Sequence, residues 1–226
     1  MKYKTFESFV NERTELYPEY GIKDLQNRLT IEELQRNYEW ILEADISGAV
    51  IGKRDPHLIW YDGEWNDGTW KNGTWRNGTW KNGVWEYGTW ENGVWEEGKW
   101  EYGKWNDGIW KNGTREHGYW KNGVWENGVW KIGQWDNGTW KNGEWLQGTW
   151  QNGTWKNGIW FAGMWVNGTW ENGVWENGEW YGGTWENGTW ENGEWIDGVW
   201  ENGTWIRGRW QQGEWKDRRN PPPDER

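Results

Sequence analysis

The chain has 226 residues, no cysteine and a formal net charge of −11 at pH 7, yet it contains 32 Trp. Without cysteine it cannot form disulfides or use a thiolate, and its acidic balance argues against direct binding to nucleic acid. No apolar run approaches the roughly 18 residues of a transmembrane helix, and the N-terminus lacks a secretory signal peptide. We therefore expect no membrane partner and a cytoplasmic or virion location.

Residues 1–59 hold nearly all of the sequence that does not repeat. At the extreme N-terminus, Phe6, Phe9 and Val10 recur at the spacing of an amphipathic helix. The same stretch, with Glu12 two positions after Val10, resembles the targeting peptide that is cleaved from internal head proteins of tailed phages. This resemblance implies a phage or viral origin and cleavage after Glu12. An ordinary amphipathic helix is the alternative interpretation.

Residues 20–59 predict a small helical cap on the repeat that follows. Thr30 and Glu33 have the spacing of a capping box, which opens a helix. A stack of β-strands must cover its first layer, because exposed strand edges promote aggregation. The expected helix carries four apolar residues, Leu34, Tyr38, Trp40 and Ile41. Two apolar runs are candidates for strands of an irregular first coil, Val50-Ile51 and Leu58-Ile59-Trp60.

Residues 60–215 form a strict five-residue repeat with the consensus Gly-Thr-Trp-(Glu/Lys)-Asn. Trp occupies every fifth position of this range except that of Arg115, and Gly follows the same period from Gly63 onward. A Trp side chain buries on the order of 150–250 Å², so the repeat alone can supply a core. A fixed short period of this kind indicates a stack of similar structural units.

Two all-β architectures compete for this repeat. Asn-Gly between short strand-like triplets is a hairpin signal and suggests an antiparallel meander. Consecutive two-residue hairpins need strands of even length, because backbone hydrogen bonds alternate in direction along a strand, and a triplet is odd. In a parallel coil Trp points inward, Thr and Glu or Lys point outward, and Asn-Gly forms a corner where Gly accepts a positive φ. The period therefore favours a parallel β-solenoid, with equivalent Asn residues in ladders.

The order of small, polar and bulky apolar residues in 60–215 resembles that of pentapeptide-repeat proteins. Those proteins commonly have Leu or Phe at the centre of the pentad and Ala behind it, whereas here the centre is Trp and the small residue is Gly. The resemblance implies a right-handed coil with four faces, each made by one pentad.

A second period of 15 residues is superimposed on the first. It indicates either three pentads per coil or descent from a duplicated 15-residue unit. A face of five residues is about 16 Å long, and three indoles overfill so small a triangle. On packing grounds we expect four faces, with three as the alternative. The irregular replacements of Asn that reveal the longer period are Tyr87, Tyr102, His117, Ile132, Gln147, Ala162 and Arg207.

The sequence predicts no catalytic, cofactor or metal site, and therefore no enzyme. It has only two His (His57 and His117) and two Ser (Ser8 and Ser47), and no motif joins a nucleophile to a base. The glycine spacing forms neither a GxGxxG nor a Walker motif. The many Glu recur as outward rungs of the repeat, so solvated faces explain them better than paired catalytic carboxylates.

Departures from the repeat are the candidates for contact with another protein or a second copy of the chain. Tyr87, Tyr102 and Tyr119 are surface aromatics outside the Trp register. The stretch 166–206 has eight acidic residues and no Lys or Arg, and so offers a patch for a basic partner. The apolar candidates in outward positions are Phe161, Met164, Val166, Tyr181, Ile196 and Ile206. The acidic candidates are Glu171, Glu176, Glu186, Glu191 and Glu201.

Two further segments have a structural interpretation. Arg115 stands where the repeat has Trp, so we expect either a local bulge of the coil or a guanidinium stacked between indoles. Residues 216–226 contain three prolines, which cannot continue a strand ladder, and predict a disordered tail.

Together these features predict a non-catalytic structural protein, a capped rod associated with a virion, that presents its repeating surface to a partner. The alternative is a binding module. Some pentapeptide-repeat proteins mimic duplex DNA and occupy DNA-binding enzymes, and this resemblance implies such a role for the acidic end. The late apolar positions would instead contact a partner chain.

Overall fold

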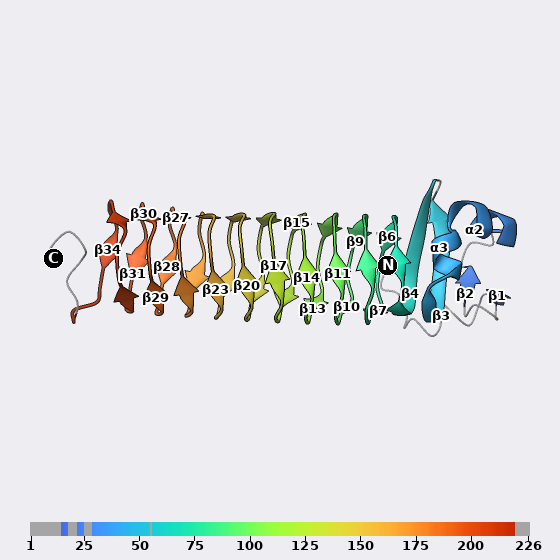
Figure 1. Cartoon of the computed structure of the whole chain (residues 1–226), viewed down its shortest axis with the longest axis horizontal. Helices are drawn as coiled ribbons and strands as arrows, with labels where there is room; N and C mark the ends of the chain where they lie inside the picture. Colours follow the sequence, from blue (N-terminus) through green and yellow to red (C-terminus); the bar gives the residue numbers. More distant parts are fainter. Residues whose placement is uncertain (1–14, 18–21, 25–28, 55, 220–226) are drawn as a thin grey trace, which may run out of the picture.

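The chain folds into a rod with a cap at its N-terminal end (Figure 1). The computed structural model describes residues 15–17, 22–24, 29–54 and 56–219. The segment that resembles a phage targeting peptide lies outside these ranges, so that resemblance stays a prediction.

The repeat forms parallel coils of 15 residues. Trp60 pairs with Trp75, and the same offset continues to the pairing of Trp200 with Trp215. Residues 60–215 therefore make about ten coils of a parallel β-solenoid, which confirms the fold class predicted from the period of five. The expectation of four faces is wrong, because each coil holds three pentads and has three faces. The resemblance to pentapeptide-repeat proteins implied a coil with four faces, so the observed coil differs from that expectation in its number of faces.

The three faces are named here by their tryptophan columns: face A begins at Trp60, face B at Trp65 and face C at Trp70. A single long strand, β4 (His57–Asp67), supplies the first layer of both face A and face B. Face A continues with β6 (Thr74–Trp75), β9 (Thr89–Trp90), β12 (Lys104–Trp105), β15 (Tyr119–Trp120), β18 (Gln134–Trp135), β21 (Thr149–Trp150), β24 (Met164–Trp165), β27 (Glu179–Trp180), β30 (Glu194–Trp195) and β33 (Arg209–Trp210). Face B continues with β7 (Thr79–Trp80), β10 (Val94–Trp95), β13 (Ile109–Trp110), β16 (Val124–Trp125), β19 (Thr139–Trp140), β22 (Thr154–Trp155), β25 (Thr169–Trp170), β28 (Thr184–Trp185), β31 (Val199–Trp200) and β34 (Glu214–Trp215). Face C contains β5 (Thr69–Trp70), β8 (Val84–Trp85), β11 (Lys99–Trp100), β14 (Thr114–Arg115), β17 (Val129–Trp130), β20 (Glu144–Trp145), β23 (Ile159–Trp160), β26 (Val174–Trp175), β29 (Thr189–Trp190) and β32 (Thr204–Trp205).

The indoles fill the triangular core by two kinds of contact. Within a column, successive rings stack with centroids 4.7 to 5.1 Å apart and planes inclined by only 3 to 8°. Between faces, consecutive indoles meet edge to face at 5.3 to 6.1 Å and 67 to 78°. These are the two arrangements that the charge distribution of an aromatic ring favours. Three rings per layer therefore pack without clashing.

Glycine corners explain why three indoles fit where they seemed too large. At Gly88 the backbone has φ +137°, and a Cβ would lie 2.4 Å from the carbonyl oxygen of Gly73 in the coil below. The same Cβ would lie 3.1 Å from Cζ2 of Trp85. The indoles thus extend into corner space that any larger residue would occupy. An estimate of packing from face length alone misses this space.

Hydrogen bonds join each coil to the next along the rod. The N–H of Arg76 donates to Trp60 O (2.7 Å) and that of Val84 to Gly68 O (2.9 Å), and equivalent bonds repeat in later pentads. The predicted Asn ladders are present, mainly at two of the three corners. On the corner between faces B and C, Asn142 Nδ2 donates to an Asn127 oxygen 3.1 Å away.

The corner between faces C and A carries the irregular residues that mark the 15-residue period, and part of it is built differently. In three successive coils the N–H of the residue in the Asn position donates to a backbone carbonyl of the coil below. These bonds run from Tyr102 to Glu86 (3.0 Å), from His117 to Glu101 (3.0 Å) and from Ile132 to Glu116 (3.1 Å). Where this backbone bond forms, the position does not require Asn; farther along the same corner Asn192 Nδ2 donates to Asn177 Oδ1 (3.3 Å), as in a ladder. We call this corner the C–A corner.

The cap covers the first coil with a mixed sheet and two short helices. β3 (Asp45–Arg54) is antiparallel to β4, β2 (Ile22–Asp24) is parallel to β3, and β1 (Glu15–Tyr17) is antiparallel to β2. Leu58-Ile59-Trp60 lies in β4 and begins the first coil, as predicted. Val50-Ile51 lies in β3 and belongs to the cap.

The predicted capping box begins α2 (Ile31–Asn37), where Thr30 Oγ1 accepts a hydrogen bond from the N–H of Glu33 (3.2 Å). The helical segment is interrupted at Tyr38 and resumes as α3 (Glu39–Leu42). This break places Trp40 over the end of the core, with its ring 4.9 Å from that of Trp70. Trp40 therefore extends the aromatic stack into the cap.

Candidate interaction surfaces

The late apolar positions fall into two separate groups. Val166, Tyr181 and Ile196 occupy one outward position of face A in three successive coils, and Met164 lies beside Val166 across Trp165. Met164 and Tyr181 are exposed, whereas Val166 and Ile196 are half-buried. The coil geometry therefore aligns Val166, Tyr181 and Ile196 in one apolar column, with Met164 at its side; Met164 itself is in register with Glu179.

Phe161 and Ile206 do not join that column. Both lie in the outer position of face C, but they are three coils apart, and Glu176 and Glu191 occupy the coils between them. Phe161 is half-buried and Ile206 is 58% exposed. The apolar stripe read from the sequence is thus interrupted on this face by two of the acidic candidates.

The other acidic candidates form a carboxylate column on face B. Glu171, Glu186 and Glu201 follow one another in successive coils, and Lys residues pair with the two outer members. Lys156 Nζ is 3.7 Å from Glu171 and Lys216 Nζ is 2.9 Å from Glu201. Exposed pairs of this kind contribute little stability, so the column remains a solvated acidic surface.

One of the apolar candidates also has a polar contact. The Tyr181 hydroxyl donates to a carboxylate oxygen of Glu179 at 2.7 Å, and this hydrogen bond raises the pKa of the tyrosine above its usual value. The two residues flank Trp180 on face A, and they show that side chains two positions apart on a face touch each other.

Arg115 occupies the core without disturbing the coil. Its guanidinium lies between Trp100 and Trp130, 4.7 and 4.9 Å from their ring centroids, and Nη2 donates to Tyr119 O at 3.1 Å. The strand register passes through Arg115 unchanged. Of the two arrangements predicted for Arg115, the stacked one is therefore present. Complete burial lowers the pKa of Arg115 to about 9, so the side chain remains a cation at neutral pH.

The early surface aromatics lie along the C–A corner. Tyr87 and Tyr102 are 58% and 51% exposed. The next coil places His117 against Tyr102, with ring centroids 4.6 Å apart and planes inclined by 2°. Tyr119 follows on face A, with Lys104 Nζ 5.6 Å from its ring centroid.

A groove of about 620 Å³ runs beside these aromatic residues, from His57 to Tyr119. The sequence singled out its tyrosines but not His57, Asn72 or Lys104, which also line it. Asn72 follows the consensus, so nothing in the pentad marks it; only the 15-residue spacing from Asn72 to Tyr87 shows that the two are neighbours.

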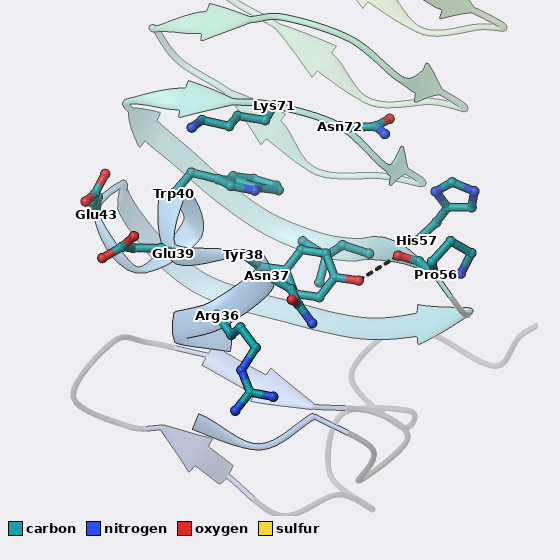
Figure 2. A pocket seen from close by; sticks show the side chains of 11 residues that line it. Arg36, Asn37, Tyr38, Glu39, Trp40, Glu43, Pro56, His57, Lys71 and Asn72 are labelled. Atoms are coloured by element: carbon teal, nitrogen blue, oxygen red, sulfur yellow. Dashed lines mark hydrogen bonds between the residues drawn. The ribbon is translucent and has the colours of Figure 1, made fainter. Parts of the chain in front are cut away.

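A second pocket of about 380 Å³ lies between the cap and the first coils. Figure 2 shows Trp40 beneath the coil that carries Lys71 and Asn72, with the Tyr38 hydroxyl donating to Pro56 O at 2.7 Å. His57 and Asn72 line both this pocket and the groove, so the two cavities are neighbours.

The part of the chain that the structure describes contains no cluster of three His, Asp or Glu placed to hold a metal ion. None of the helices in that part is long and apolar enough to cross a membrane. Comparisons with protein-family models, curated proteins and solved structures found no match to the chain.

Proposed function

We propose that this protein is a non-catalytic structural component, a rigid rod that holds its surfaces at fixed spacing within a larger assembly. The observation that supports this function best is the uninterrupted 15-residue register from Trp60 to Trp215. Arg115 replaces one indole, but every other described coil repeats the same core, and the backbone bonds along the three faces continue from coil to coil. The described part of the rod therefore contains no break in register that would act as a hinge.

Rigidity follows from how the indoles pack. An inner ring such as Trp140 stacks on Trp125 and Trp155 (4.8 and 4.7 Å) and meets Trp135 and Trp145 edge to face (6.1 and 6.0 Å). Bending the rod would open stacked contacts on one side and compress them on the other, and close-packed interiors resist both.

A virion is the setting that we propose for this rod. The support is the likeness of residues 1–12 to the targeting peptides of phage internal head proteins. Mass spectrometry of particles purified from the source should find the chain, with its N-terminus at Arg13 if the peptide is cleaved. Absence from particles, or neighbouring genes for metabolism instead of capsid or tail, would contradict this setting.

The rod itself is tested by small-angle scattering. The scattering profile should fit one stiff rod whose cross-section stays constant between low and high salt, because aromatic packing and not charge holds the coils. A flexible ensemble of conformations would exclude a structural role for the repeat.

A second candidate function is a binding module, favoured by the alignment of Val166, Tyr181 and Ile196 on face A, with Met164 beside them. Replacement of Val166 and Ile196 by Ser should release a protein partner that this column holds, at any salt concentration. A basic partner held by the carboxylate column should instead dissociate at high salt, because screening shortens the range of the interaction, and should be weakened by Glu186→Gln.

A further inference from the structure

The groove along the C–A corner has the shape of a site for a chain-like ligand. It passes Gly73, Gly88, Gly103 and Gly118, which occupy the same position in four successive coils. Successive coils are about 4.8 Å apart, so the groove extends along the rod axis. The cap pocket lies next to the His57 end of the groove.

Exposed tyrosines give the groove its main contact surface. Tyr87 and Tyr102 each present more than half of their surface to solvent, although the other aromatic side chains of the repeat are mostly buried. A tyrosine combines an apolar ring with a hydroxyl, and a sugar unit combines an apolar C–H face with hydroxyls. Stacking on His117 holds the Tyr102 ring in place before a ligand binds, which lowers the entropy lost on binding.

The remaining lining residues suit hydroxyl groups better than apolar side chains. Asn72, Thr74 and Thr89 supply amide and hydroxyl donors and acceptors. No Leu, Ile, Val or Met lines the groove. A peptide that docks through apolar anchors would therefore find no aliphatic pocket for them.

Charge in and around the groove is balanced. Lys104 is in the lining and no Asp or Glu is, although the chain as a whole carries a net charge of −11. Glu101 and Glu116, which precede corner residues, are paired with Lys99 (2.8 Å) and Lys131 (2.9 Å). A polyanion would meet an acidic protein with a single groove lysine, and a polycation would find no carboxylate in the lining.

We propose that this groove binds an extended, uncharged carbohydrate chain. The tyrosine rings contact the C–H faces of successive sugar units, and Asn72, Thr74 and Thr89 exchange hydrogen bonds with their hydroxyls. The proposal does not depend on the virion setting, because it rests only on the side chains of the groove.

Affinity electrophoresis of the full chain tests the site. The gels contain soluble hydroxyethylcellulose, xylan, glucomannan or dextran, with heparin and polyuridylate as polyanions. We expect at least one neutral polysaccharide to retard the protein. Tyr87→Ala and Tyr102→Ala should each weaken that retardation by about tenfold or more, as expected for exposed aromatic anchors. Tyr87→Phe should retain most of it, because the ring remains.

Tyr181→Ala is the matched control, because Tyr181 is an exposed tyrosine of the same rod outside the groove. It should bind the polysaccharide like the unchanged chain. Thermal melts of all variants ensure that lost binding does not reflect lost folding. The proposal is overturned if no neutral polysaccharide retards the chain, if Tyr181→Ala weakens retardation as much as the groove variants, or if only the polyanions bind.

Discussion

Gly182 and Gly183 are adjacent in the sequence but occupy different positions in the pentad. Gly183 has φ +101°, and a Cβ there would lie 2.3 Å from Gly168 O. Gly182 stands in the Asn position, where the nearest atom to a Cβ is Val166 O at 3.5 Å. The glycine period is thus imposed by backbone conformation together with the approach of the coil below.

Alanine at these two positions should therefore have opposite effects on stability. Gly183→Ala should lower the free energy of unfolding by about 1–3 kcal/mol or more, the usual cost of strained backbone. Gly182→Ala should be neutral or stabilise by up to about 1 kcal/mol, because it restricts the unfolded chain. Urea unfolding followed by circular dichroism measures both. Equal effects of the two substitutions would contradict the assigned corner geometry.

Arg115 is the one cation within the described indole core. An indole at position 115 would continue the column between Trp100 and Trp130, whose other members already stack at this spacing. Replacing buried charged groups by well-packed apolar ones commonly stabilises proteins by about 1–4 kcal/mol. We expect Arg115→Trp to raise the urea midpoint. Arg115→Lys should lower it, because an ammonium keeps the charge without a planar group to lie between the rings.

The pH dependence of this stability gain distinguishes two causes: removal of a buried charge, and better filling of the core by an indole. The pKa of Arg115 is about 9 in the folded chain, well below the ordinary value of an arginine. Between these values the unfolded state holds one more proton than the folded state, so the stability of the unchanged chain rises with pH. The advantage of Arg115→Trp should therefore be full below pH 9 and should shrink above it. An advantage that is constant up to pH 11 would exclude this cause.

At the scale of the strand and corner, one Asn ladder contains a gap that can be closed. On the corner between faces B and C, Glu97 lies between Asn82 and Asn112, whereas the ladder is continuous from Asn112 onward. Glu97→Asn should form hydrogen bonds to both neighbours and stabilise the chain by about 0.5–1.5 kcal/mol. A thermal melt measures the gain.

Ile132→Asn is the control for the ladder. It introduces the same residue at the C–A corner, where the neighbours are His117 and Gln147 and where a backbone bond to Glu116 (3.1 Å) already joins the coils. Little change in stability is expected there. A gain from Ile132→Asn equal to that from Glu97→Asn would mean that Asn acts through the local turn and not through a ladder.

Most features of the elements could be predicted from the sequence because each pentad specifies them locally. The inward Trp, the Gly corner, the Asn ladder and the Thr30 cap all follow from residue type and spacing. The backbone of the C–A corner could not be predicted in this way. Its distinct hydrogen bonds depend on the coil below, and so the sequence reveals them only as an irregularity in every third pentad.

The number of faces per coil is a property of the whole molecule, and local reasoning predicted it wrongly. The 15-residue period indicated three faces, but the estimated size of a five-residue face favoured four. That estimate treated the indoles as filling only the space inside the strands, whereas they also use the corner space left by glycine. The groove escaped prediction for a related reason: His57 and Tyr119 belong to different coils, and a coil count is needed to place them on one corner.

Deletions of whole coils test the face number across the entire rod. Removing residues 136–150 takes out one coil of three pentads and leaves each later residue in its own column. The chain should fold with nearly unchanged cooperativity and form a rod shorter by about 4.8 Å. Removing 136–155 takes out four pentads and turns all later residues by one face, which places Ala162 above Asn127 and Asn167 above Ile132. The indole stack survives this shift, and so do the ladders and charge pairs within each half, but those that cross the new junction are lost. The longer deletion should therefore melt at a lower temperature than the shorter one. The reverse order of melting temperatures is the result that a four-faced coil would give.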